Sequence, residues 1–156
     1  MSDIELSALA ARVQRLEDER EVQRVLTSYG LAVDSDSVEA MMRLYAEDAV
    51  VDIDGTTLMH GREETRQIVE GSAHQAILPT CAHVMGPYVV EVEGDRAVAT
   101  GYATVFTLQE GRQQVWRQSF GRFDLERREG RWQITRRSSR SLGHEQAFEL
   151  VRPALR

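Results

Sequence analysis

The chain has 156 residues, 42% of them hydrophobic and 28% charged, with a formal net charge of −6 at pH 7. This composition suits one globular domain spanning residues 1–156, and the excess of negative charge argues against a nucleic-acid partner or an anionic membrane surface. All 19 basic residues are arginine, which excludes Schiff-base formation and other reactions that need a lysine.

Cysteine content and hydrophobic runs set further limits. Cys81 is the single cysteine, so an internal disulfide cannot form. No apolar run approaches the roughly 20 residues of a membrane-spanning helix, and the first residues lack the features of a signal peptide. We therefore expect a cytoplasmic protein without a membrane partner.

Residues 22–34 have the spacing of an amphipathic helix that ends at Asp34. Its apolar positions share one face at a period of 3.6 residues, so we expect that face, including the Tyr29 phenol, to be buried. These positions are Val22, Val25, Leu26, Tyr29 and Val33. An earlier stripe, Leu6, Leu9, Val13 and Leu16, would lie almost opposite on one straight helix, so we predict a kink or break near residues 17–21. This leading helix packs either on its own domain or on a neighbouring subunit.

A short helix and a hairpin follow. Asp36, with Glu39 three residues later, has the spacing of a capping box and predicts the start of a second helix. The core-facing positions of this helix are Val38, Met41, Met42 and Tyr45. Residues 50–53 and 57–59 predict two strands joined by the two-residue turn Asp54-Gly55, and residues 62–70 predict a third helix.

From residue 79 onward the hydrophobic pattern changes to a period of two. Turn signals at residues 86–87, 93–95, 110–111 and 129–130 interrupt it, and the economical interpretation is four long strands in meander order. Residues 144–151 predict a short helix. The fold class is therefore α+β, with N-terminal helices packed on one face of a curved, mostly antiparallel sheet. Such a sheet can close around a pocket.

The strand predicted at residues 96–108 has two unlike faces. One carries bulky side chains such as Tyr102 and Phe106, whereas the other carries small ones. The small residues are Ala97, Ala99, Gly101 and Ala103. We expect them, together with Arg117 and residues 136–140, to lie on the convex face of the sheet and to form a contact between subunits.

His83 has the most unusual setting of the four histidines. In the strand Cys81-Ala-His83-Val-Met85, alternation places Cys81, His83 and Met85 on one apolar side. A lone strand histidine is either a satisfied core residue or a functional group. His60 and His74 lie beside turns and are expected to be solvated. No histidine has the spacing of a metal site, so we expect no metal.

These segments together resemble a known family. Tyr29-Gly-Leu-Ala-Val-Asp34, a following short helix, the segment 47–55 and His83 are similar to the SnoaL-like branch of the NTF2-like superfamily. Within it the chain is most similar to the lyase-type members: scytalone dehydratase, hexachlorocyclohexane dehydrochlorinase and bile-acid 7α-dehydratase. The resemblance covers nearly the whole chain. It implies a cone-shaped α+β barrel that needs no cofactor and forms a homo-oligomer, a dimer or a trimer.

The resemblance also implies a catalytic site. Asp34 and His83 match the catalytic pair of the lyase-type members, and Tyr29 matches a tyrosine five residues before the aspartate. A second pocket tyrosine of the bile-acid enzyme would fall near Ile53 and is missing. Arg137 matches an arginine in the last strand of the dehydrochlorinase, within about one residue of alignment.

The chemistry of the pair follows from its residue types. A carboxylate bonded to His83 stabilises the imidazolium, so the ring can take a proton from a carbon beside a carbonyl or an electron-poor ring. Tyr29 can donate a hydrogen bond where negative charge develops. The expected pocket walls are Met41, Met85, Phe106 and Trp116. We predict a lyase or isomerase, dehydratase-like or ketosteroid-isomerase-like, that acts on a hydrophobic cyclic small molecule.

Two other classes remain open. One is a non-catalytic ligand-binding domain, and the other is a structural subunit like the small subunit of ring-hydroxylating dioxygenases, which resembles this fold. The joint presence of Tyr29, Asp34 and His83 favours catalysis over both. Contact between these residues in an apolar cavity would support the catalytic hypothesis.

Overall fold

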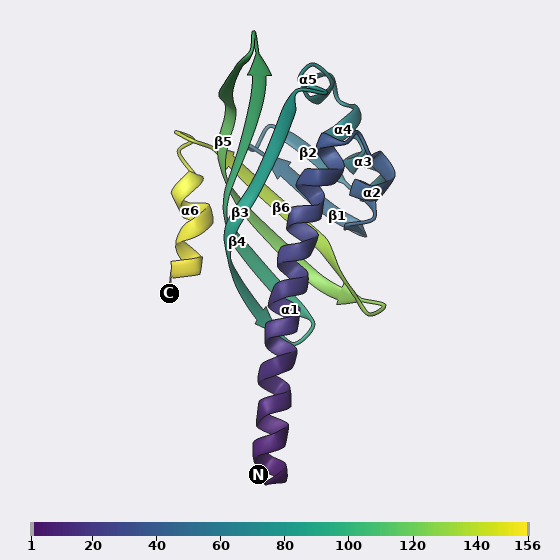
Figure 1. Cartoon of the computed structure of the whole chain (residues 1–156), viewed down its shortest axis with the longest axis vertical. Coiled ribbons are helices and arrows are strands. Elements are labelled where there is room, and N and C mark those ends of the chain that lie inside the picture. The colour runs from purple at the N-terminus through teal and green to yellow at the C-terminus, as the bar shows by residue number, and fades with distance from the viewer. Residues whose placement is uncertain (1, 156) are drawn as a thin grey trace.

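The computed structural model describes residues 2–155 and shows helices packed on one curved, six-stranded sheet (Figure 1). The strands are β1 (Tyr45–Ile53), β2 (Thr57–His60), β3 (Cys81–Glu93), β4 (Arg96–Gln109), β5 (Arg112–Arg128) and β6 (Arg131–Ser141). The helices are α1 (Asp3–Asp34), α2 (Val38–Met42), α3 (Arg62–Thr65), α4 (Gln67–Glu70), α5 (Ser72–Gln75) and α6 (Ala147–Val151), and a 3₁₀ turn covers Arg152–Leu155. The predicted α+β class and the meander of four long strands are confirmed.

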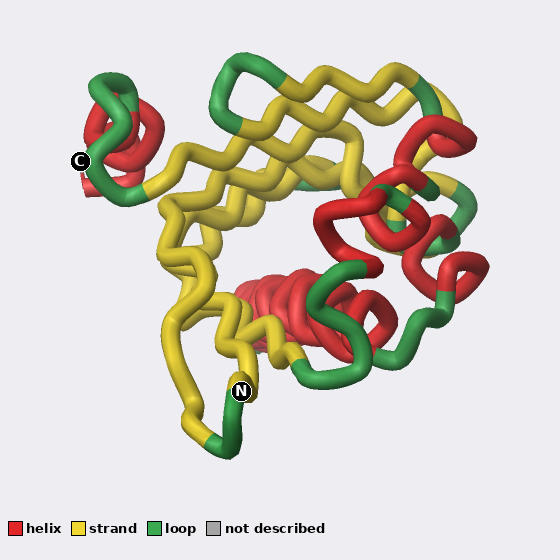
Figure 2. The backbone as a smooth tube through the Cα atoms, turned by 90° about the horizontal axis from the view of Figure 1, so that it is seen from above, coloured by secondary structure: helices red, strands yellow, loops and turns green. Residues whose placement is uncertain are grey.

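The sheet has the order β2-β1-β6-β5-β4-β3. Its neighbouring strands are antiparallel except for β1 and β6, which run parallel. Viewed from above, the strands curve around α1 and the short helices, while α6 lies on the outer side of the sheet (Figure 2). There Phe148 of α6 packs on Phe120 of β5, with 5.6 Å between the ring centroids.

Three local expectations need correction. Asp36 is not the N-cap of α2, because it adopts a left-handed turn conformation with φ of +55° and Ser37 stands between it and the helix. The hairpin loop between β1 and β2 has three residues rather than two, since Ile53 pairs directly with Thr57. The helix predicted at residues 62–70 is divided at Arg66 into α3 and α4.

Helix α1 runs unbroken from Asp3 to Asp34, so the predicted kink is wrong. One straight helix can carry two opposed stripes because its second half packs on the sheet while its first half projects beyond it (Figure 1). The stripe of the first half, Leu6, Leu9, Val13 and Leu16, is between 45% and 61% exposed. Among residues 2–155, no helix is both long and apolar enough to span a membrane.

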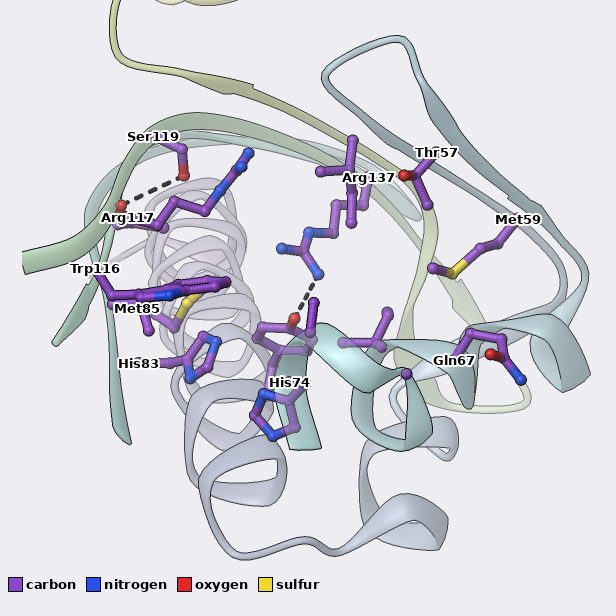
Figure 3. A pocket seen from close by; sticks show the side chains of 17 residues that line it. Thr57, Met59, Gln67, His74, His83, Met85, Trp116, Arg117, Ser119 and Arg137 are labelled. Carbon is purple, nitrogen blue, oxygen red and sulfur yellow. Dashed lines mark hydrogen bonds between the residues drawn. The ribbon is translucent and has the colours of Figure 1, made fainter. Parts of the chain in front are cut away.

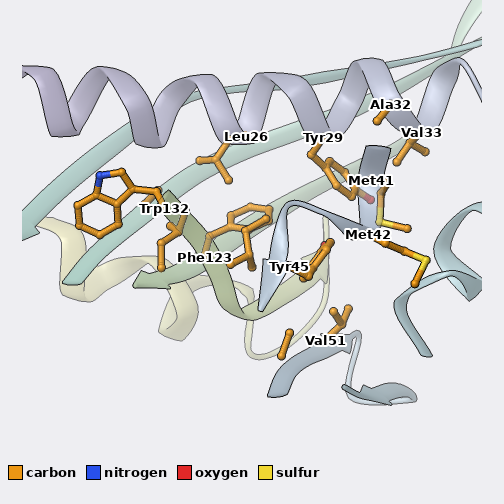
Figure 4. Close-up of a cluster of buried hydrophobic side chains, with 14 of the residues drawn as sticks. Leu26, Tyr29, Ala32, Val33, Met41, Met42, Tyr45, Val51, Phe123 and Trp132 are labelled. Carbon is orange, nitrogen blue, oxygen red and sulfur yellow. The ribbon is translucent and has the colours of Figure 1, made fainter. Parts of the chain in front are cut away.

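The main hydrophobic core lies between the second half of α1 and the concave face of the sheet (Figure 4). Val22, Leu26, Tyr29 and Val33 of α1 are buried there, as the helical period predicted. Tyr29 meets the ring of Tyr45 edge to face, with the centroids 6.4 Å apart. The core therefore holds the last turns of α1 in place above the sheet.

The concave face of β4 carries its small residues, which corrects their predicted position on the convex face. Ala97 and Ala99 are buried in the core, and Ala103 lines the cavity described below. A small residue is required at Gly101, because a Cβ atom there would clash with the carbonyl oxygen of Pro87 and lie 2.9 Å from the Tyr88 ring. Phe106 and Tyr102 belong to the opposite face, where Tyr102 is 53% exposed.

Gly30 allows α1 to approach β3 closely. A Cβ atom at this position would lie 2.6 Å from the carbonyl oxygen of His83 and 3.1 Å from Cγ of Met85. The first contact is with backbone, which cannot rotate away. Glycine is therefore required if the end of α1 is to lie against the strand that carries His83.

Replacing Gly30 by alanine tests this close approach. Alanine usually stabilises a helix by about 1 kcal/mol relative to glycine. We expect Gly30→Ala instead to lower the free energy of unfolding by about 1–3 kcal/mol, because backbone must shift to admit the methyl group. Urea denaturation measures the change, and Thr27→Ala on the exposed side of the same helix serves as the control. A Gly30→Ala variant as stable as the wild type would contradict this account.

Candidate active site

A cavity of about 270 Å³ lies between the end of α1, the segment of α4 and α5, and the concave face of the sheet (Figure 3). It is lined by Tyr29, Ile53, Thr57, Met59, Gln67, Ile68, Gly71, Ala73, His74, His83, Met85, Ala103, Val105, Trp116, Arg117, Ser119 and Arg137. Most of the wall is apolar, with a few polar side chains directed inward. A cavity of this kind suits a small, mainly hydrophobic ligand.

His83 lines this cavity and is in direct contact with Asp34, which lies behind it at the end of α1. The Nδ1–H of His83 donates to Oδ1 of Asp34 at 2.6 Å, and the backbone N–H of His83 donates to Oδ2 at 2.7 Å. Both carboxylate oxygens are thus occupied by one residue, which fixes the ring. Because a carboxylate accepts, Nδ1 carries the proton and Nε2 remains free to act as a base. The predicted contact is confirmed.

Burial controls the protonation of His83. The imidazole is only 11% exposed, and this burial lowers its pKa below the ordinary value of 6.5. The hydrogen bond and charge of Asp34 oppose the shift, whereas Arg137 and His74 reinforce it. The balance leaves His83 as a neutral imidazole at neutral pH, which is the form that accepts a proton.

Cys81 also contacts the carboxylate. Its thiol donates to Oδ1 of Asp34 at 3.5 Å, and burial together with that carboxylate raises the thiol pKa to about 11. The donor atoms of Asp34, Cys81 and His83 lie within 4.8 Å of one another, a spacing that a metal ion could bridge. A metal ion at this position would have to deprotonate the Cys81 thiol and replace the Nδ1–H of His83 on Asp34. The hydrogen bonds that the three residues make with one another fit an orienting role.

His74 is a site residue that sequence reasoning missed. It was expected to be solvated, but its side chain is buried and lines the cavity. Its Nε2–H donates to the carbonyl oxygen of Val33 at 3.1 Å, and its ring centroid lies 5.5 Å from that of His83. Two successive residues at the end of α1, Val33 and Asp34, therefore hold two neighbouring imidazoles.

Arg137 and Tyr29 form the second polar group of the cavity. A guanidinium N–H of Arg137 donates to the Tyr29 hydroxyl, and its Cζ lies 4.7 Å from the centre of the Tyr29 ring. Within residues 2–155 no carboxylate pairs with Arg137, and its Nε is buried without a hydrogen-bond partner. Tyr45, next to it, stays a neutral phenol because burial raises its pKa. The positive charge of Arg137 is therefore not balanced by a neighbouring acid.

The other arginine of the cavity is neutralised. Arg117 donates to Oδ2 of Asp54 at 2.8 Å, and Asp54 also accepts from the backbone and hydroxyl of Ser141. Although burial opposes it, these donors lower the pKa of Asp54 to about 2.

Trp116, the residue before Arg117, is the extra residue of a β-bulge. Val105 of β4 pairs with Arg117, and the next residue, Phe106, pairs with Val115, so Trp116 has no partner in β4. The bulge lets two consecutive residues line the cavity.

Two of the expected wall residues lie elsewhere. Met41 is fully buried in the core cluster, and Phe106 lies on the outer face of β4, so neither lines the cavity. Alternation along a strand separates two faces without saying which one is inside, and Phe106 was assigned to the wrong face. Met85, Trp116 and Arg137 do line the cavity.

Comparison with known proteins agrees with this architecture. Residues 14–138 match the SnoaL-like domain family. The chain belongs to the SnoaL-like family. An NTF2-like protein with a cystatin-like fold from Novosphingobium aromaticivorans is 34% identical, with a TM-score of 0.89 over 94% of this chain and 97% of that one. The family and the NTF2-like fold suggested by the sequence are therefore confirmed.

Two more distant solved structures share the fold. A protein from Novosphingobium aromaticivorans proposed to be a scytalone dehydratase is 18% identical, with a TM-score of 0.71 over 82% of this chain and 86% of that one. A hexachlorocyclohexane dehydrochlorinase from Novosphingobium barchaimii is 16% identical, with a TM-score of 0.71 over 83% of this chain and 90% of that one. Comparison with functionally curated proteins gives no match.

The protonation of His83 can be measured directly. We expect its imidazole to titrate below 6.5 in the wild-type protein, because burial disfavours the charged ring. Asp34→Asn should lower the pKa further, since the change removes the carboxylate that favours the imidazolium. NMR titration of the ring protons gives both values, and His83→Gln identifies the resonance. A pKa that rises in Asp34→Asn would show that Asp34 does not stabilise the charged ring.

Proposed function

We propose that this SnoaL-like protein is a cofactor-independent lyase or isomerase that abstracts a proton from a hydrophobic cyclic small molecule. The observation that carries the proposal is the pairing of His83 with Asp34 through Nδ1, which leaves Nε2 unprotonated in a largely apolar cavity. A neutral imidazole in such a setting is a base whose conjugate acid is stabilised by the carboxylate behind it.

The reaction steps follow from the positions of the polar groups. Nε2 of His83 would take a proton from a carbon that is made acidic by a neighbouring carbonyl or leaving group. The electron pair of that C–H bond then forms either an enolate or a new double bond with departure of the leaving group. Tyr29 and Arg137 line the same cavity and would stabilise the negative charge on the enolate oxygen or on the leaving group. In an isomerase, the protonated His83 returns the proton to another carbon.

The unbalanced charge of Arg137 supports this assignment. Arg137 is half-buried, and a cation partly removed from water without an acidic partner is costly unless another group compensates it. A substrate oxygen that gains negative charge, or a departing anion, would supply that compensation during the reaction. Arg117 is less suited to this role because Asp54 already neutralises it.

The non-catalytic alternatives account for the cavity but not for its chemistry. A ligand-binding domain or a structural subunit needs no base with a fixed tautomer in the same cavity as an arginine that lacks an acidic partner. The size and apolar character of the cavity fit a binding domain equally well. Turnover, rather than binding, therefore separates the hypotheses.

Activity and pH test the base. With cyclic alcohols, ketones and halides screened for loss of water or acid, kcat/KM should rise with pH through the pKa of His83, below 6.5, and then level off. In Asp34→Asn the amide oxygen can still accept the backbone N–H of His83, and the amide N–H then donates to Nδ1 of the ring. The ring proton must therefore move to Nε2, so Nε2 can no longer act as the base. In an analogous carboxylate–histidine pair this change costs about 10⁴ in kcat.

The controls for this experiment are structural. Asp34→Asn should remain folded by circular dichroism, so that lost turnover is not lost structure. His83→Ala should be at least as inactive. Near-full activity of both variants on a substrate that the wild type converts would refute the proposed base.

Arg137 can be tested separately from the base. Arg137→Met keeps an apolar side chain of similar length but removes the charge, so we expect kcat/KM to fall by about 10²–10³ with little change in the pH profile. Arg136→Met, an exposed neighbour on the same strand, is the matched control and should retain activity. Equal activity of the two variants would remove Arg137 from the mechanism.

A further inference from the structure

The first half of α1 presents an apolar stripe that its own domain does not cover. Residues 2–17 are all exposed, and in Figure 1 this part of the helix extends past the end of the sheet. Leu6, Leu9, Val13 and Leu16 form the stripe, and each is at least 45% exposed. We call these four residues the α1 seam.

The spacing of the α1 seam is that of a coiled coil. Successive members are three, four and three residues apart, which places Leu6 and Val13 at heptad position a and Leu9 and Leu16 at position d. A seam restricted to a and d is the narrow type that pairs with another helix. Arg20 and Gln23 occupy the next a and d positions, so the apolar seam ends at Leu16.

The orientation of the α1 seam leaves room for a partner. At 3.6 residues per turn, the seam points almost directly away from Val22, Leu26 and Tyr29, which face the protein's own sheet. A helix that pairs along the seam therefore meets no part of this domain. Two copies joined in this way would carry their domains on opposite outer sides of the helix pair.

The charges beside the α1 seam identify the partner as a second copy in parallel orientation. In a parallel pair, position g faces position e of the next heptad on the other chain. Arg12 would then face Glu17 of the partner subunit, and Glu19 would face Arg24 of the partner subunit, so both pairs attract. The acidic residues flanking the seam also disfavour an anionic membrane as the partner.

An antiparallel pair in the register that buries the whole seam would bring like charges together. Glu5 would meet Glu19 of the partner subunit, and Asp3 would meet Glu17 of the partner subunit. Arg12 would lie opposite its own copy. Like charges at e and g positions exclude an orientation in the same way that opposite charges select one.

We propose that α1 joins two copies of this chain through a parallel, two-stranded coiled-coil contact along Leu6, Leu9, Val13 and Leu16. Two strands are favoured over three because β-branched Val13 at position a is combined with leucine at both d positions. The proposal goes beyond the catalytic hypothesis and does not depend on it. It assigns the first half of α1 to subunit association and the second half to the active site.

Disulfide trapping tests the contact and its direction. In a parallel pair Leu9 faces its own copy, so full-length Leu9→Cys should form a covalent dimer under mild oxidation. Ala11→Cys, on the opposite side of the helix, should not, and the wild type controls for Cys81. A Leu9→Cys variant that stays monomeric would overturn the proposal. Cross-linking that appears only when Leu9→Cys is mixed with Val13→Cys would overturn the parallel orientation.

Sedimentation equilibrium of the full chain tests the partner and the charges. The wild type should have twice the 17.7 kDa mass of one chain, and Leu9→Arg combined with Val13→Arg should be a folded monomer. Arg12→Glu or Glu17→Arg alone should raise the dimer dissociation constant roughly tenfold, because each exchange turns attraction into repulsion at two symmetric pairs. The two exchanges together should restore the wild-type dissociation constant. A monomeric or trimeric wild type, or a double exchange weaker than either single one, would refute the proposal.

Discussion

The contact between Asp34 and His83 determines how the rest of the site is arranged. One carboxylate at the end of α1 accepts both the backbone N–H and the ring N–H of a single residue in β3. Hydrogen bonds to a charged group are among the stronger ones in proteins, and leaving these donors unpaired would be costly. The same interaction therefore fixes the helix end on the strand and fixes the tautomer of the ring. Gly30 makes this possible, because a side chain there would hold the helix away from β3.

The protein pairs some of the arginines enclosed by the fold with a carboxylate and leaves Arg137 without one among the described residues. Arg140 makes a two-pronged ion pair with Asp52, at 3.0 and 2.7 Å, and Arg117 pairs with Asp54. These pairs secure the junction of β1 with β6 and β5, so they act as structural supports of the cavity wall. Arg137 has the Tyr29 hydroxyl as its hydrogen-bond partner and no acid nearby among the described residues. This contrast distinguishes the arginines that hold strands together from the one arginine that faces the cavity without an acidic partner.

Local periodicity and the family resemblance made different parts of the site predictable. The helical period placed Tyr29 inward and Asp34 at the helix end, and strand alternation placed His83 and Met85 on one side. The contact between Asp34 and His83 was anticipated from the resemblance to the SnoaL-like lyases, because periodicity alone does not bring two distant segments together. The burial of His74 could not be anticipated, because it lies in a chain of one-turn helices whose burial depends on α1 packing beside them. Phe106 and the small residues of β4 were assigned to the wrong faces, since alternation does not say which face a helix will cover. A kink or break in α1 was expected because the two apolar stripes would lie on almost opposite sides of one straight helix. In the structure only the second stripe packs on the sheet, so the helix needs no break.

The bulge at Trp116 gives β5 two different alternations. On the side of Ser119 the odd-numbered residues point into the cavity, whereas beyond the bulge Gln114 shares the inner face and Val115 is 57% exposed. Removing one residue at the bulge would restore regular alternation, with Gln114 still on the inner face and Val115 still outside, and would leave one cavity-lining side chain where two consecutive residues now stand. The number of residues at this point therefore sets how many side chains of β5 face the rim of the cavity. An insertion or deletion there changes the shape of the rim, and with it the molecules that fit, while His83 and Asp34 keep their geometry.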